Sequence, residues 1–369
     1  MQVCKGESVV FKPKYIITPK IASELIKIES LAQDIRHLPI TPKVLEHLRQ
    51  TARLESIHYS TKIEGNRLTL DQVAEVLSSK KIPGRERDEK EVNGYFQALN
   101  AVKDWVARQE PITVTLLQQL HAYVMGGGRE NVTPTPYRDG QNVIREGSTG
   151  AIVYLPPEAS DVPELMSDLV DWILASKLKM VPTPVCAAIA HYQFATIHPY
   201  YDGNGRTARL LATMIMHEGG YDLKGIYSLD EYYASDLPSY YNALDIGSSH
   251  NYYMGRADED ITSWIDYFCS GVGYSFDKIK RQAVQAQKRG EKDVSEELQQ
   301  LDERQRKVVS YFHKRETLTA NDVAKVLKVS QRTARALCQA WVQEEFLMII
   351  NPAKKTRTYA IKKSNKISL

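Results

Sequence analysis

The segment His198–Arg209 constrains the fold of this chain more than any other part of the sequence. It reads His-Pro-Tyr-Tyr-Asp-Gly-Asn-Gly-Arg-Thr-Ala-Arg and follows a run with a helical pattern. Because Pro199 cannot continue that helix, the chain must turn after His198. Gly203 and Gly205 allow backbone conformations that are closed to other residues, so the loop can direct several N–H groups into one concavity. The segment therefore predicts two helices joined by a tight, anion-binding loop.

The side chains of this segment indicate which chemistry the anion site serves. A helix follows the loop directly, so its positive N-terminal end faces the same concavity. Arg206 and Arg209 are three residues apart on one face of that helix, where both can clamp a phosphate. Asp202 supplies the oxygen ligand that Mg²⁺ prefers beside phosphates, and His198 is the nearby group that accepts a proton near neutral pH. These groups together predict phosphoryl or nucleotidyl transfer.

Two other phosphate-binding patterns are disfavoured. Gly203–Ala208 also fits the G-x-G-x-x-A pattern of dinucleotide-binding folds, but that pattern must follow a strand, and here a helical run precedes it. No strand with an acidic residue about 20 positions further on is evident either. The pattern G-x-x-x-x-G-K-S/T does not occur in the sequence.

The fold class predicted by apolar spacing is mainly α. With 43% apolar residues among 369, the chain can bury a sizeable core. Thr69 is placed to cap a short helix, with Gln72 completing a capping box. The exception is a β-hairpin, in which the extended runs Asn142–Arg145 and Ala151–Leu155 flank a glycine-containing turn. The longer predicted helices are Pro19–His37, Pro42–Ile63, Glu91–Ala107, Val114–Val124, Val162–Ser176 and Pro184–Ile197, with a long helical stretch over Gly255–Gly290.

The C-terminal part differs from the rest in charge. From Asp302 onward the chain has 15 Lys and Arg against 6 Asp and Glu, a net charge of +9, so residues 1–301 carry −6 of the total of +3. A charged segment, Arg289–Glu297, predicts a linker before it. The predicted elements follow the order of a winged helix-turn-helix: helices at Glu303–His313, Ala320–Leu327 and Gln331–Glu344, then strands at Phe346–Ile350 and Arg357–Ile361.

This basic region has two candidate partners, DNA and protein. Residues 302–369 would meet DNA phosphates through a recognition helix and a wing. The basic and polar side chains concerned are Gln331, Arg332, Arg335, Lys354, Lys355 and Arg357. We therefore expect three parts: an N-terminal helical region over 1–110, a catalytic core over 111–290 and a winged helix-turn-helix domain over 291–369.

The segment His198–Arg209 resembles the signature of the Fic family, His-Pro-Phe-x-Asp/Glu-Gly-Asn-Gly-Arg-x-x-Arg. Tyr200 stands in place of the usual Phe, and every polar position matches. The resemblance extends from about Phe11 to Tyr267. It implies a helical bundle with a β-hairpin flap, and an enzyme that moves AMP from ATP to a Ser, Thr or Tyr hydroxyl of a protein. ATP is then the substrate and Mg²⁺ the metal.

The resemblance also implies a role for each matched residue. His198 is the general base for the incoming hydroxyl, and Asp202 holds Mg²⁺ against the phosphates. A kinase-like branch of the family has Lys at the position of Gly205, which favours transfer of AMP over transfer of phosphate. The residues that hold the phosphates are Gly203, Asn204, Gly205, Arg206 and Arg209.

A second motif lies far upstream. Ser60 and Glu64 are four residues apart at the end of a predicted helix, and Gly65 stops that helix. They resemble the inhibitory motif of the family, S/T-x-x-x-E-G/N. The resemblance implies that Glu64 pairs with Arg209 and blocks productive seating of the ATP γ-phosphate, as in the branch with an N-terminal inhibitory helix.

Two further features are interpreted through the family. The hairpin resembles the flap, whose edge can pair with the extended backbone of a target and aim its hydroxyl at His198. Tyr240 and Tyr241 are candidates for the wall of the adenine pocket. Family members often have Asn-Arg just before such a pair, where this chain has Asp236 and Leu237.

Two rival functions fit the same residues. In a hydrolase, Glu64 would position the water that removes AMP from a modified protein; in a DNA-binding regulator, the Fic core would only sense nucleotide. No run of about 18 apolar residues and no signal-peptide block is present, and the four cysteines form no C-x-x-C pair. We therefore expect a cytoplasmic protein without membrane contact. Self-modification and oligomerisation stay open.

Overall fold

The structure is a computed structural model that describes residues 11–38, 40, 42–145, 150–288, 317–353 and 357–361, together with positions 304, 305, 308 and 312. Backbone contacts divide the chain into two units. The first unit comprises residues 1–38 and 48–282, and the second comprises residues 39–47 and 283–369. Each unit is described on its own.

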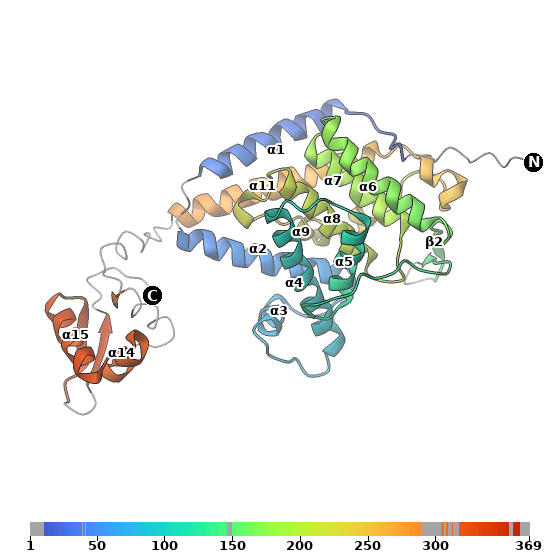
Figure 1. The fold of residues 1–369 in the computed structure, drawn as a ribbon. Coiled ribbons are helices and arrows are strands. Elements are labelled where there is room, and N and C mark those ends of the chain that lie inside the picture. The colour runs from blue at the N-terminus through green and yellow to red at the C-terminus, as the bar shows by residue number, and fades with distance from the viewer. Residues whose placement is uncertain are drawn as a thin grey trace, which may run out of the picture. The chain divides into compact units, whose positions relative to one another are not determined.

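The centre of the first unit is α7 (Thr183–Ile197), whose residues are buried on nearly every side. A helix that is apolar all round belongs in the middle of a bundle. It packs against α8 (Asn204–Glu218), the helix that follows the loop 198–203 (Figure 1). The surrounding helices are α4 (Glu86–Ala107), α5 (Val114–Met125) and α6 (Val162–Leu178).

Three long helices complete this bundle: α1 (Pro19–His37), α2 (Pro42–Ile63) and α11 (Thr262–Lys288). The observed bounds of α1 and α2 are those that the sequence predicts. Ion pairs join α1 to α11 at Lys20–Asp266 and Asp34–Lys280, each at 2.6 Å. The helical stretch predicted from Gly255 begins only at Thr262, because Gly255 adopts φ +119° between two short 3-10 helices.

The smaller elements of the first unit cover the ends of the bundle. The capping box of Thr69 and Gln72 is present at the start of α3 (Leu70–Leu77), as predicted. The others are η1 (Leu223–Gly225), α9 (Asp230–Ser235), α10 (Leu237–Leu244), η2 (Tyr252–Met254) and η3 (Arg256–Asp258).

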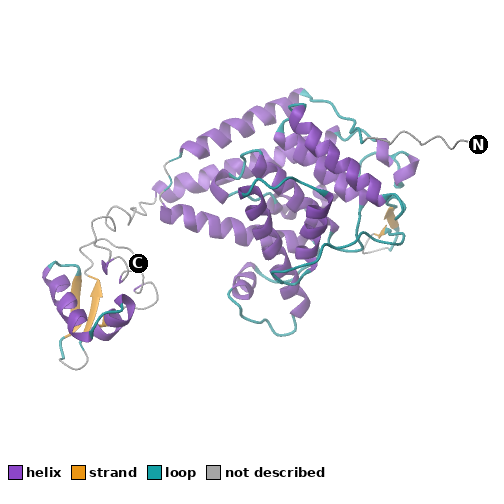
Figure 2. Cartoon of the chain, in the orientation of Figure 1, coloured by secondary structure: helices purple, strands orange, loops and turns teal. Residues whose placement is uncertain are grey.

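A β-hairpin stands out in this mostly helical unit (Figure 2). Its antiparallel strands, β1 (Ile144–Arg145) and β2 (Ile152–Tyr154), are shorter than the predicted runs. The tip, residues 146–149, lies outside the described part of the chain. The Tyr154 hydroxyl donates to the Thr196 carbonyl at 2.8 Å, so the hairpin is attached to the last turn of α7.

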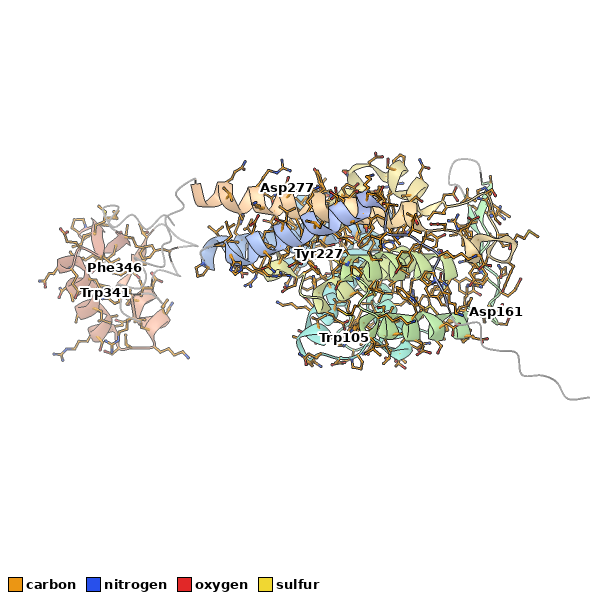
Figure 3. All side chains as sticks on the ribbon, turned by 90° about the horizontal axis from the view of Figure 1, so that it is seen from above. Trp105, Asp161, Tyr227, Asp277, Trp341 and Phe346 are labelled. Carbon is orange, nitrogen blue, oxygen red and sulfur yellow. The ribbon has the colours of Figure 1, made fainter. Side chains whose placement is uncertain are left out.

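Among its described residues, the second unit contains α14, α15 and a three-stranded antiparallel sheet in the order β3-β5-β4. Its core includes the rings of Trp341 and Phe346, which meet edge to face at 5.6 Å (Figure 3). The predicted helix Glu303–His313 and linker Arg289–Glu297 fall largely or wholly on residues that are not described. The elements are α14 (Ala320–Leu327), α15 (Gln331–Gln343), β3 (Leu318–Thr319), β4 (Leu347–Asn351) and β5 (Thr358–Ile361).

Over its described residues the chain is therefore mainly helical with small antiparallel sheets, which confirms the mainly α part of the predicted fold class. The short strand β3 was not foreseen. Over the described residues, none of the helices combines the length and apolar character that crossing a membrane requires.

Candidate active site

His198 lies where α7 gives way to the loop. It adopts the left-handed conformation, φ +52°, and its N–H closes the helix on the Phe194 carbonyl. The imidazole Nδ1 lies 3.2 Å from the Ala195 carbonyl oxygen. Because a carbonyl only accepts, Nδ1 carries the proton there and Nε2 keeps its lone pair. Burial lowers the pKa of His198 to about 4, so the ring is neutral at pH 7 and can accept a proton.

The loop leaves the first turn of α8 open to an anion. Gly203 occupies the N-cap position with φ +79°, and no side chain caps the helix. The Asn204 side chain instead braces the loop, since it accepts from the Tyr200 N–H at 3.0 Å and donates to the Tyr200 carbonyl at 2.7 Å. The backbone N–H groups at the start of α8 are therefore the donors available to a phosphate.

Asp202 projects beside this open turn. Its Oδ1 accepts from the Gly203 N–H at 2.6 Å and from Nη2 of the buried Arg206 at 3.1 Å, which leaves Oδ2 without a hydrogen bond among the described residues. Among the residues that the structure describes, no three His, Cys, Asp or Glu side chains gather as a metal site. A single carboxylate together with substrate phosphates is how Mg²⁺ is usually held, so Asp202 fits that ion.

Two residues that the sequence motifs did not indicate support the loop. His121 lies with Nε2 2.8 Å from the Asp202 carbonyl oxygen, and its ring stacks on Tyr200 at 3.6 Å between centroids. The sequence offered one indication of a role for His121, namely a histidine on the apolar face of a predicted helix. No sequence pattern indicated a role for Arg138, although its guanidinium donates to the carbonyls of His198, Gly140 and Pro157. It thereby links both ends of the hairpin to the loop.

The structure brings Glu64 and Arg209 together. Arg209 is 2% exposed, and its Nη2 donates to Oε1 of Glu64 at 2.9 Å. Ser60 contributes twice, since its hydroxyl accepts from Arg209 Nε at 2.8 Å and its carbonyl from Nη2 at 2.9 Å. The end of α2 therefore contacts the guanidinium that α8 presents.

A second carboxylate, Asp230, also faces Arg209 and was not among the predicted site residues. Its Oδ1 lies 3.5 Å from Arg209 Nε, and its Oδ2 accepts from the Ser56 hydroxyl at 2.6 Å. Burial raises the pKa of Asp230, and the Arg209 charge opposes that rise. Burial alone would lower the pKa of Arg209, but its acidic neighbours outweigh that effect and keep it charged.

The two tyrosines proposed for the adenine pocket differ in exposure. Tyr240 is 2% exposed, with its hydroxyl 3.1 Å from His191 Nε2 and its ring 4.5 Å from that of Tyr233. Tyr241 is 48% exposed, and its hydroxyl donates to the Ile63 carbonyl at 3.4 Å. Only Tyr241 is thus at the surface, beside the end of α2.

Comparison with known proteins places this site in a family. Residues 111–216 match the Fic/DOC family. The protein adenylyltransferase Fic of Nematostella vectensis is 28% identical over 200 residues, which are 53% of this chain and 45% of that protein. The protein adenylyltransferase fic-1 of Caenorhabditis elegans is 31% identical over 217 residues, 57% of this chain and 41% of that protein. The chain matches less than half of the length of these relatives.

Solved structures agree in fold. The crystal structure of a Fic family protein from Desulfovibrio desulfuricans has a TM-score of 0.63 and 25% identity, covering 95% of this chain and 98% of that chain. A Fic domain containing signaling protein from Bacteroides thetaiotaomicron has a TM-score of 0.58 and 25% identity, covering 72% and 96%. The helical bundle around α7 and α8 is a Fic fold. Residues 111–216 accordingly form a Fic domain, and the chain has distant homology to protein adenylyltransferases.

Proposed function

We propose that this chain transfers AMP from ATP to a Ser, Thr or Tyr hydroxyl of a target protein. The observation that carries the proposal is the convergence of three groups at one loop. These are the neutral imidazole of His198, the carboxylate of Asp202 and the uncapped first turn of α8. Distant relatives that are named protein adenylyltransferases support the same activity.

In this mechanism Nε2 of His198 accepts the proton of the target hydroxyl. The hydroxyl oxygen forms a bond to the α-phosphorus of ATP, and the bond from that phosphorus to the β-phosphate oxygen breaks, so pyrophosphate leaves. The N–H groups of α8 stabilise the negative charge on the phosphates. Mg²⁺, held by Asp202 and the phosphates, would neutralise part of that charge.

The resting chain inhibits itself in this proposal. Arg209 is one of two arginines that hold the phosphate tail, and its Nη2 is bonded to Glu64. A γ-phosphate must compete with that carboxylate for the same guanidinium. ATP then binds with its α-phosphate out of line for attack, and activity stays low until Glu64 is displaced.

The test is incorporation of labelled AMP by the purified chain, into itself and into proteins of a cell lysate. We expect low incorporation by the wild type, strong incorporation by Glu64→Gly and none by Glu64→Gly with His198→Ala. Absence of labelled AMP on any protein with the Glu64→Gly variant would refute the activity. Mass spectrometry of the labelled lysate identifies the target.

Removal of AMP is a second candidate, because the Oε2 atom of Glu64 forms no hydrogen bond among the described residues and the side chain is 28% exposed. That oxygen can orient a water toward a phosphate. Incubation with an AMP-modified target separates the two directions. Release of AMP that depends on both Glu64 and His198 would favour the hydrolase.

For the second unit we propose a winged helix-turn-helix domain over 291–369 that binds DNA, with a division from the core near residue 290. The supporting observation is the exposed face of α15, which carries Arg332, Arg335 and Gln339. Mobility shift with genomic DNA fragments at increasing salt is the test. Affinity that falls with salt, and falls further in Arg332→Ala with Arg335→Ala, supports DNA contact. Binding unaffected by either change would exclude it.

A further inference from the structure

Asp230 is a buried carboxylate that no step of the proposed transfer uses. It opens α9, and its partners come from α8 and α2. Oδ2 is satisfied by the Ser56 hydroxyl. Oδ1 is buried and has no hydrogen-bond partner in the described part of the chain, so its charge is compensated by Arg209, whose Nε lies 3.5 Å away. A buried charge persists only when it is paired, which makes these two residues interdependent.

The contacts of Arg209 divide by atom into those that must change and those that need not. Its Nη2 donates to Glu64, the contact that a phosphate has to replace, and also to the Ser60 carbonyl. Its Nε faces the Ser60 hydroxyl and Asp230, and both of these residues are buried. When Glu64 withdraws, Asp230 is the carboxylate left against the buried guanidinium.

We propose that Asp230 is a positioning residue that, together with Ser56, holds Arg209 in the orientation that accepts the phosphate tail of ATP after Glu64 has withdrawn. This inference rests on the proposed function. Asp230 acts through Arg209 and does not touch the nucleotide. Its effect is therefore specific to nucleotides whose β- and γ-phosphates reach Arg209, and it does not extend to AMP.

Isothermal titration calorimetry on the full chain in the Glu64→Gly background tests this, with ATP and AMP as separate probes. Asp230→Asn keeps the size of the side chain and an oxygen for the Ser56 hydroxyl but removes the charge. We expect about tenfold weaker ATP binding, similar to other losses of an outer-shell partner, with AMP binding unchanged. Glu231→Gln is the matched control, because this neighbouring carboxylate pairs with Lys278 and its loss should alter neither affinity.

Two results would overturn the inference: unchanged ATP affinity in Asp230→Asn, or a parallel loss for ATP and AMP, which indicates a general structural role. If that variant does not fold, Ser56→Ala decides, because it removes only the hydroxyl that donates to Asp230. Selective weakening of ATP then supports the inference and unchanged ATP binding overturns it. If Glu64→Gly itself binds no ATP, the proposed function fails together with the inference.

Discussion

A Cβ atom on Gly205 would lie 2.3 Å from Oε1 of Glu64 and 3.1 Å from Nη1 of Arg209. The Glu64 carboxylate thus occupies the space directly against the first turn of α8. Cβ atoms essentially never come that close, so any other residue at 205 would require the Glu64 carboxylate to shift from its observed position. In the proposed function a phosphate on the open helix end would lie in the same space, so the proposed inhibition would have a steric as well as an electrostatic basis.

This relationship predicts a stability coupling that does not depend on any activity. Gly205→Ala should destabilise the wild type by about 1–3 kcal/mol, the usual cost of overpacking, and much less in the Glu64→Gly background. Urea unfolding of the wild type, Gly205→Ala, Glu64→Gly and the double variant gives the coupling energy between positions 64 and 205. Gly273→Ala is the control, since its Cβ would meet Glu24 and Lys27, and its cost should be equal in both backgrounds. Equal costs for Gly205→Ala in both backgrounds would contradict the observed contact.

His198 should be required for the chemical step but not for nucleotide binding. Replacement by alanine removes the base and should lower AMP transfer by about 10²–10⁴-fold in the Glu64→Gly background, with ATP affinity nearly unchanged. Because burial lowers the pKa of His198 to about 4, the base is unprotonated over the whole neutral range. The rate of transfer should therefore stay flat between pH 6 and 8. A rate that rises through an apparent pKa near 6.5 would assign the base elsewhere.

Stability should fall as the pH is lowered from neutrality. Burial lowers the pKa of His191 to about 3, and those of His121, His198 and His217 to about 4. Unfolded histidines titrate near 6.5, so below that pH the unfolded chain binds protons that the folded chain does not. The free energy of unfolding then decreases by up to about 1.4 kcal/mol per pH unit for each histidine.

Thermal unfolding between pH 7.5 and 4.5 measures this dependence. Among the described residues, the ring of His217 meets that of Tyr227 and no proposed site residue, so His217→Gln is a suitable variant and should make the decline less steep. A melting temperature that is constant over this range would show that the histidines are not buried as described.

The loop, the position of His198 at its start and the Glu64–Arg209 contact were predictable from the sequence, because each residue belongs to a short contiguous motif. Helix ends were predictable where Pro, Thr or Gly marks them, as at α1 and α3. Asp230 escaped because 174 positions separate it from Ser56, and such a contact leaves no local pattern. For the same reason the sequence could not tell which tyrosine of the pair 240–241 faces the core. That choice depends on how α10 packs against α7.

Arg209→Ala should cost stability as well as activity. It would leave Asp230 as an unpaired charge in the interior, and losing one partner of a buried pair costs about 3–5 kcal/mol. Asp230→Asn added to Arg209→Ala should restore much of that loss, since no charge then remains unpaired. Denaturant unfolding of the single and double variants measures the recovery. A double variant as unstable as Arg209→Ala would mean that Asp230 is not the source of the cost.

The most informative single change is Glu64→Gly. The hydrogen bond between its carboxylate and Arg209 is charge-assisted and the guanidinium is buried, so we expect ATP to compete poorly for Arg209. Misplacement of the reacting phosphate costs on the order of 10²-fold in rate. Removing the Glu64 carboxylate should therefore raise self-modification by about that factor. Glu64→Gln keeps the shape of the side chain but not its charge. Its rate of self-modification should lie between those of the wild type and Glu64→Gly, because the amide still lies against Gly205. Adding Arg209→Ala should abolish the gain, because removal of Glu64 helps only if the Arg209 guanidinium is present to bind the phosphate.

Labelled AMP incorporation across the wild type and these variants measures the effect. If Glu64→Gly is no more active than the wild type on any acceptor, including itself, the inhibitory interpretation is wrong; if it also removes AMP from a modified target as fast as the wild type, Glu64 has no role in hydrolysis.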